Sequence, residues 1–226
     1  MSAILFSAEP LNSPSYQKSM AEEAEKFSRQ AKTNLAPVYP FLAEYLVEKF
    51  KLADKEGIGI DLGSGPGDLL IELAKRTKSM YWINADINPW YFVHFNQSLL
   101  MEGLSQRAGA VFADAQSLPF RDNYADVIVS RGSYEFWDNR KLGFSEIYRV
   151  LKTGGAAFIG RGLPENLPLE VAKSIRGGRG PKYEVEKEAD ELRRIMEELK
   201  IKDFEILIPH QEQKEVKYGI WIRFSK

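Results

Sequence analysis

The sequence contains no cysteine and only two histidines, His94 and His210, among its 226 residues. Without cysteine, a disulfide, a thiolate zinc site, an iron–sulfur cluster and a cysteine nucleophile are all excluded. The two histidines lie far apart in the sequence, so a histidine-rich metal site is not expected either. We therefore predict no metal site.

The chain also lacks a surplus of charge of either sign. Lys and Arg number 31 and Asp and Glu number 32, which gives a net charge of -1 at pH 7. A dedicated nucleic-acid-binding protein normally carries a strong basic excess. We therefore expect no nucleic-acid partner.

Long apolar runs are absent as well. No stretch of about 18 apolar residues occurs, so the pattern predicts no transmembrane helix. The opening residues MSAILFSAEPLN have neither the basic flank nor the long apolar core of a signal peptide. The expectation is a cytoplasmic protein that does not contact a membrane.

Apolar runs alternate with helix-like segments through the middle of the chain, and this alternation predicts an α/β fold. Near-continuous apolar strands are typical of a parallel sheet covered by helices on both faces. We expect strands at 57–63, 79–86, 108–114, 124–130 and 156–160. Helices are expected at 68–77, 89–101 and 139–151, the last of them stopped by Gly154.

The two ends of the chain differ from this middle part. Helices are expected at 16–34 and 41–50, separated by the sequence LAPVYP, and a charged helix at 185–199. The apolar runs DFEILIP and KYGIWIRFS are joined by a short polar link, which favours antiparallel neighbours. We predict a single domain, 1–226, with a helical cap (1–50), a core (56–160), a variable loop region (161–184) that includes the flexible segment RGGRGP, and a C-terminal helix and hairpin (185–226).

Three glycines at alternate positions follow the first expected strand, in GIDLGSGPGDLLIEL. Gly63, Gly65 and Gly67 allow positive φ angles or the close approach of a ligand, although a structural turn alone would also use them. A dinucleotide fingerprint would need glycine where Asp68 stands, and no Walker lysine follows. The acidic surroundings favour a ligand that has no phosphate or that carries positive charge.

Carboxylates also follow the second and third expected strands. Asp86 is suited to accept both hydroxyl groups of a ribose, although capping of the next helix is an alternative. Asp114 could accept from an exocyclic amine and the Ala115 N–H could donate to a ring nitrogen, whereas a solvated turn would also explain Asp114. Together these residues predict an adenosine site beside an acidic pocket, a combination that S-adenosylmethionine fits.

Four segments of the sequence, read in order, resemble a known family. GIDLGSGPG, INADINP, FADAQSLPFRDNYADVIVSRGS and EIYRVLKTGGAAFIG are similar to the class I S-adenosylmethionine-dependent methyltransferases, in their small-molecule branch. The resemblance covers about residues 56–160. It implies a Rossmann-like fold: a seven-stranded, mostly parallel sheet with helices on both faces and a C-terminal antiparallel hairpin.

The resemblance also implies a set of cofactor-binding residues. It places Asp61 and Gly63 near the methionine moiety, Asp86 on the ribose, and Asp114 with Ala115 on the adenine. It brings the region of Ser130 to the amino group of the cofactor. The full predicted set is Asp61, Gly63, Ser64, Gly65, Gly67, Asp86, Ile87, Asp114, Ala115, Ser130 and Arg131.

The predicted activity is methyl transfer from S-adenosylmethionine to a small-molecule acceptor. Positioning can supply most of the catalysis, so no catalytic dyad is required, and the weak candidates for a base are Glu135, Tyr134 and Tyr39. Arg161 could bind an anionic acceptor or lie in a solvated loop. Two alternatives stay open: a protein that binds the adenosyl ligand without transfer, and a nicotinamide-dependent oxidoreductase.

Overall fold

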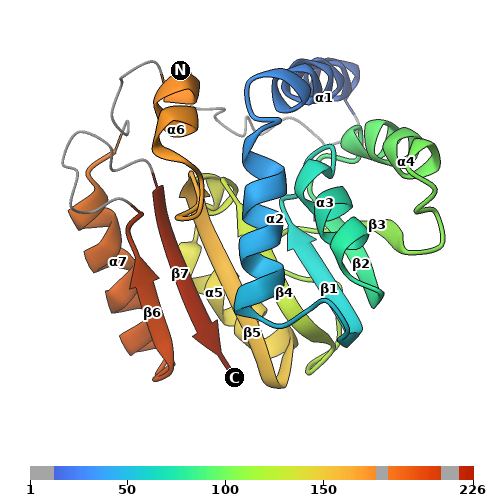
Figure 1. Cartoon of the computed structure of the whole chain (residues 1–226). Coiled ribbons are helices and arrows are strands. Elements are labelled where there is room, and N and C mark those ends of the chain that lie inside the picture. The colour runs from blue at the N-terminus through green and yellow to red at the C-terminus, as the bar shows by residue number, and fades with distance from the viewer. Residues whose placement is uncertain (1–12, 177–182, 210–218) are drawn as a thin grey trace.

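The computed structural model describes residues 13–176, 183–209 and 219–226. Within them, seven strands form one sheet in the order β3-β2-β1-β4-β5-β7-β6 (Figure 1). Strands β1 to β5 run parallel to their neighbours, and β7 runs antiparallel to both β5 and β6. The strands are β1 (Glu56–Leu62), β2 (Ser79–Asp86), β3 (Ala108–Phe112), β4 (Ala125–Arg131), β5 (Leu151–Gly162), β6 (Phe204–Leu207) and β7 (Gly219–Ser225). This sheet confirms the predicted fold class.

Helices cover both faces of the sheet, because alternate side chains of each strand point to opposite faces and both sets are apolar. Leu42, Leu70 and Phe95 of α2, α3 and α4 pack on one face, and Phe144 and Leu192 of α5 and α7 pack on the other. The helices are α1 (Pro14–Thr33), α2 (Val38–Lys49), α3 (Asp68–Arg76), α4 (Tyr91–Met101), η1 (Tyr134–Phe136), α5 (Arg140–Val150), α6 (Leu169–Arg176) and α7 (Val185–Glu198).

Two expected boundaries were wrong. Helix α2 begins at Val38 rather than at residue 41, and Pro40 lies inside its first turn, where a missing N–H costs nothing. Gly154 does not stop α5, because the helix ends at Val150 and β5 begins at the next residue. Instead, Gly154 has φ +79° within β5 and donates its N–H to the Lys226 carbonyl over 2.8 Å. The strand therefore has 12 residues, not the five expected.

Helix α6 occupies part of the segment that was expected to be a loop. Leu167 and Ala172 are buried against Val38 of α2 and Leu163, which follows β5. Figure 1 shows α6 and α1 along the upper edge of the molecule, where the parallel strands end. The predicted flexible segment RGGRGP lies almost entirely outside the described residues, and the four-part division of the chain stays a prediction.

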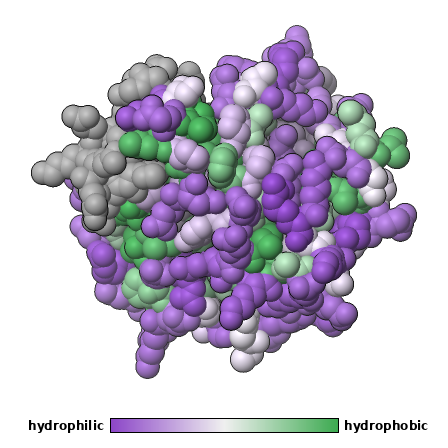
Figure 2. All heavy atoms as spheres, viewed as in Figure 1, coloured by the Kyte–Doolittle hydropathy of each residue, from purple (hydrophilic) through white to green (hydrophobic). Residues whose placement is uncertain are grey.

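The surface is mostly hydrophilic, with scattered hydrophobic groups (Figure 2). One group lies over α4, where Val93 is 54% exposed and Met101 is 87% exposed. Among the described helices, none has the length and apolar character that a bilayer crossing demands.

Candidate active site

Four predicted site residues meet at the edge where β1, β2 and β4 end. Asp61, Asp86 and Ser130 are buried there, with exposed fractions of 2%, 6% and 1%. The parallel register pairs Asp61 of β1 with Asn84 of β2 and with Val129 of β4, which brings these strand ends side by side. Arg131 is the last residue of β4 and lies at the same edge. Parallel strands thus gather residues from distant parts of the chain, as the sequence predicted.

The glycine loop joins β1 to α3 in a conformation that requires glycine. Gly63, Gly65 and Gly67 have φ angles of 66°, 57° and 83°, which are strained for other residues. A methyl group added to Gly63 would lie 2.2 Å from Cβ of Ser133, and one added to Gly67 would lie 2.2 Å from the Phe95 ring. Turn geometry and close packing both account for these glycines in the structure.

Two side chains of β2 form hydrogen bonds with the backbone of Gly65, one with its N–H and one with its carbonyl group. Its N–H donates to Oδ2 of Asp86 over 2.7 Å, and its carbonyl accepts from Nδ2 of Asn84 over 3.0 Å. Asn84 is fully buried and was missed in the sequence, where its signal is a polar residue inside an apolar strand. Both contacts fix the loop against the end of β2.

The Asp61 carboxyl group has an unusually high proton affinity. Burial raises its pKa from 3.8 to about 7, and the nearby charge of Asp86 acts in the same direction. The Ser64 hydroxyl donates to Oδ2 over 2.6 Å, and this bond and the charge of Arg131 lower the pKa without cancelling the effect of burial. A cation placed beside Asp61 would therefore be bound strongly.

Asp86 bonds to the backbone on two sides. Besides the N–H of Gly65, its carboxylate accepts the N–H of Asn88 over 2.8 Å. Burial raises its pKa to about 6, the charge of Glu23 acts in the same direction, and hydrogen bonds from the backbone limit the rise. Among the described side chains none caps α4, so helix capping does not explain Asp86. Its hydrogen bond to Gly65 fixes Asp86 beside the glycine loop, and its role toward a ribose stays a prediction.

Asp114 and Ala115 follow β3 in a tight turn. The Asp114 carboxylate accepts the N–H of Gln116 over 2.8 Å, so the turn itself uses part of this carboxylate. Ala115 is buried, with 7% of its surface exposed. Ile87 lies nearby at 37% exposure, in a groove of about 260 Å³ that Trp90 and Phe112 also line. These residues supply an apolar surface next to the turn.

The segment after β4 connects to β1 through two hydroxyl groups. The hydroxyl oxygens of Ser130 and Ser133 lie 2.5 Å apart, and the Ser133 hydroxyl also donates to the Leu62 carbonyl over 3.2 Å. The Arg131 guanidinium lies over the ring of Tyr39 from α2, with its Cζ 5.5 Å from the ring centre. Tyr39 is 7% exposed, and burial raises its pKa to about 12.

The weak base candidates are poorly suited to accept a proton at neutral pH. Tyr134 is fully buried, and burial raises its pKa, as it does for Tyr39. Glu135 forms an ion pair with Arg161, so neither side chain is free to meet an acceptor in this conformation. Trp137 packs against Phe144, whereas Phe136 is 69% exposed.

A largely buried ionic network lies behind the segment that follows β4. Arg161 of β5 also bonds to Glu188 of α7 over 3.0 Å, and Glu188 in turn bonds to Arg140 of α5 over 3.0 Å. Glu188 is only 8% exposed, so this charge of the predicted charged helix is buried rather than solvated. The sequence gives no local signal for pairs that join residues so far apart.

Helix α1 lies across the site and buries it. The Met20 carbonyl accepts from Nδ2 of Asn88 over 3.0 Å, and Phe27 packs edge-on against Tyr91 with ring centres 6.0 Å apart. A methyl group added to Gly65 would lie 3.3 Å from the Phe27 ring. The sequence predicted the helix but not this position, which explains why Asp86 is so little exposed.

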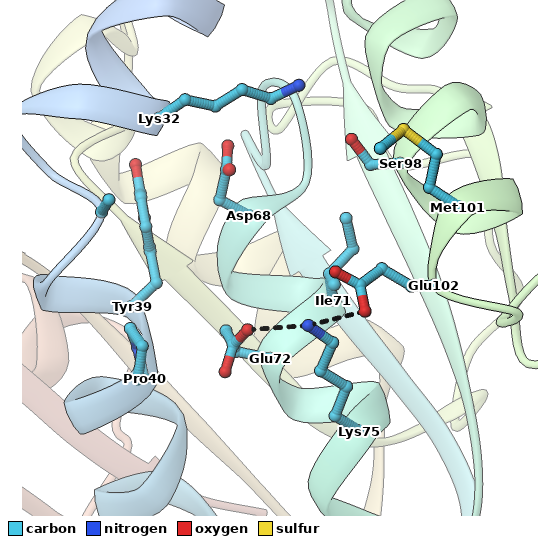
Figure 3. Close-up of a pocket in the computed structure, with 11 residues that line it drawn as sticks. Lys32, Tyr39, Pro40, Asp68, Ile71, Glu72, Lys75, Ser98, Met101 and Glu102 are labelled. Carbon is cyan, nitrogen blue, oxygen red and sulfur yellow. Dashed lines mark hydrogen bonds and ion pairs between the residues drawn. The ribbon is translucent and has the colours of Figure 1, made fainter.

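An open pocket of about 360 Å³ lies beside the site (Figure 3). At its lower end Lys75 bridges Glu72 and Glu102, over 3.2 and 2.9 Å. At its upper end Lys32, Tyr39 and Asp68 point toward the cavity. It is lined by Lys32, Ala36, Tyr39, Pro40, Asp68, Ile71, Glu72, Lys75, Ser98, Met101 and Glu102, a set with no member of the predicted cofactor-binding residues.

Comparison with known proteins agrees with this architecture. A family profile described as "Methyltransferase domain" matches residues 60–159. The crystal structure of a putative S-adenosyl-L-methionine-dependent methyltransferase from Methanococcus maripaludis is 31% identical, covers 91% of this chain and 93% of its own, and superposes with a TM-score of 0.78. The chain belongs to the S-adenosylmethionine-dependent methyltransferases. This confirms the resemblance found in the motifs, and the family's cofactor is the one that the sequence predicted.

Curated relatives share shorter segments with this methyltransferase. A 2-methyl-6-phytyl-1,4-hydroquinone methyltransferase of Arabidopsis thaliana is 37% identical over 43% of this chain and 28% of its own length. A demethylmenaquinone methyltransferase of Bacteroides fragilis is 34% identical over 51% of this chain and 48% of its own. The chain thus spans less than half the length of both relatives.

Proposed function

We propose that this protein transfers a methyl group from S-adenosylmethionine to a small-molecule acceptor. The observation that carries the proposal is the pair of buried carboxylates, Asp61 and Asp86, that bond to one glycine loop at the carboxyl edge of the sheet. Ligands of open α/β sheets bind at this edge. Two buried acids without a lysine in the loop suit a cationic ligand that has no phosphate.

Each group of predicted residues would bind a different part of the cofactor. Asp86 would accept from the ribose, and Asp114 with Ala115 would meet the adenine, against which Ile87 offers an apolar surface. Asp61, the glycine loop and the Ser130 carbonyl would hold the methionine part. Bound S-adenosylmethionine supplies an activated methyl group on its sulfonium.

The protein's own contribution would be positioning and exclusion of water. Helix α1 covers the site, and the ionic network behind Glu135 and Arg161 keeps the wall after β4 in place. Holding an acceptor in line with the methyl group can supply roughly 7–11 kcal/mol of the barrier. No residue that is a ready base at neutral pH is needed for this part of the catalysis.

A quinol ring is the first acceptor to test. The names of the relatives from Arabidopsis thaliana and Bacteroides fragilis state a hydroquinone and a demethylmenaquinone as their substrates. A small aromatic acceptor of this kind also agrees with the balanced charge of the chain, which favours no nucleic acid. A place in the cytoplasm stays a prediction.

Calorimetry with S-adenosylhomocysteine tests the cofactor site. The wild-type protein should bind it and should not bind NAD, and Asp86→Ala should weaken binding by roughly 10- to 150-fold, because a charged hydrogen bond is worth about 1.5–3 kcal/mol. Asp138→Ala, at an exposed aspartate, is the matched control and should leave binding unchanged. Absence of binding to the wild type would overturn the proposal.

Transfer itself is tested with methyl-labelled S-adenosylmethionine and menadiol, a simple quinol. Label that moves into the menadiol supports an enzyme of the proposed class. Tight cofactor binding without transfer to menadiol or to the small molecules of a cell extract would favour a binding protein instead.

A further inference from the structure

We propose that Arg131 binds the carboxylate at the amino-acid end of S-adenosylmethionine and thereby selects the intact cofactor over its decarboxylated form. The proposal rests on the proposed function, and it concerns a single residue of the same site. Its basis is the position of Arg131 and the fact that no described residue forms a hydrogen bond or ion pair with its guanidinium.

Arg131 lies on the same face of the sheet as Asp61. Side chains alternate along a strand, and Val127 and Val129 of β4 pack in the core that α2, α3 and α4 cover, so Arg131 follows them on that face. On β1, a side chain at Gly59 would meet Trp82 in the same core, which places Asp61 on that face too. The register pairs Asp61 with Val129, so Arg131 lies just beyond Asp61 at the sheet edge.

The guanidinium of Arg131 is held in place but not neutralised. It stacks on Tyr39, its Nε is buried without a hydrogen-bond partner, and the described residues provide it with no ion pair. Other half-buried arginines bond to carboxylates or carbonyl groups, as Arg140 and Arg149 do. A partly buried charge without a partner is costly, so an incoming anion would be bound well.

The chemistry of the neighbouring residues identifies that anion. The amino-acid end of the cofactor carries an ammonium and a carboxylate on one carbon atom, and Asp61 with Arg131 supplies one opposite charge for each. The planar guanidinium can donate two parallel hydrogen bonds to a carboxylate. Lys32 of α1 points instead into the pocket toward Asp68 (Figure 3).

Two ligands that differ only in the carboxylate test the proposal: S-adenosylhomocysteine and its decarboxylated form. The wild-type protein should bind the first roughly 10- to 150-fold more tightly, the range of a charged hydrogen bond. Arg131→Met should lose this preference, with affinity for the decarboxylated ligand changed less than about threefold. Arg131→Lys keeps the positive charge but cannot donate two parallel hydrogen bonds, so it should retain part of the preference. It replaces Arg131→Met in the test if the methionine variant does not fold.

Lys32→Met is the matched control. It removes one positive charge from the same side of the protein and should leave the preference unchanged. If Arg131→Met weakens both ligands equally, or neither, the inference is wrong while the proposed function stands. If the wild-type protein binds neither ligand, the proposed function itself fails.

Discussion

Replacing Asp61 by asparagine should stabilise the ligand-free protein at alkaline pH more than at acidic pH. The carboxyl group is 2% exposed, and its only hydrogen bond in the described structure comes from Ser64 to Oδ2. Asparagine can accept the same bond through its carbonyl oxygen and place its amide where the other carboxylate oxygen stood. The substitution therefore removes a buried charge with little change of shape.

The magnitude follows from the pKa of Asp61, which burial raises from 3.8 to about 7. Between these two values the folded protein keeps a proton that the unfolded chain has released, so stability falls as pH rises through this window. The loss is complete above pH 7 and amounts to about 4 kcal/mol there, but to only about 2 kcal/mol at pH 5. Asp61→Asn should abolish this loss.

Urea unfolding of wild type and Asp61→Asn at pH 5 and pH 8 measures the effect. The difference in free energy of unfolding between the two proteins should be about 2–3 kcal/mol larger at pH 8 than at pH 5. An unpaired asparagine amide lowers the variant's stability equally at both pH values, so it cancels in this comparison. Asp138→Asn, an exposed control, should change stability by less than about 0.5 kcal/mol. A difference that is the same at both pH values would refute the reasoning about Asp61.

Two other perturbations test the contacts around the site. Asn88→Ala removes the side-chain hydrogen bond between Asn88 and the Met20 carbonyl of α1. Amide hydrogens of α1 should then exchange about fivefold faster than in the wild type, as measured by mass spectrometry, while exchange in β1 stays unchanged. The same exchange rate of α1 in variant and wild type would show that this bond does not hold the helix. Arg161→Met leaves Glu135 without its cation and Glu188 with Arg140 alone, and it should cost about 3–5 kcal/mol in urea unfolding, against less than about 1 kcal/mol for Arg193→Met at an exposed ion pair. A loss no larger than that of the control would mean that water reaches the network.

Local patterns in the sequence predicted the sheet well. The run SMYWINAD gave β2 its observed bounds, because an apolar strand between turn residues is a local signal. The segment KTGG was wrongly assigned as a helix stop, because its lysine and glycines resemble a turn. Leu151 and Ala156 on either side of it pair with β4, and its two glycines form backbone hydrogen bonds with Lys226, contacts that only the folded chain provides.

The gathering of the candidate site residues at one sheet edge was predicted, for a related reason, while their roles toward the cofactor stay predictions. The strand-end residues could be found because parallel strands bring their ends together whatever the details of packing. The position of α1 over Asp86 and the network around Glu188 could not be found, since both join segments far apart in the sequence and their residues have no distinctive spacing. The sequence predicted an acidic pocket, and in the structure Asp61 and Asp86 are buried, with α1 bonded to Asn88 just after Asp86.

That burial connects stability with binding. Burial raises the pKa of both Asp61 and Asp86; the charge of Asp86 adds to the rise for Asp61, and the charge of Glu23 on α1 adds to the rise for Asp86. A hydrophobic pair would make a more stable edge of the sheet, so the acids are a poor choice for folding alone. A ligand with a cationic sulfur and an ammonium group would offset the cost that the two carboxylates impose. The two buried acids are therefore better explained by a cationic ligand than by the needs of the fold. In the same way, Arg131 at the same edge, which has no ion-pair partner among the described residues, is better explained by an anionic group of the ligand.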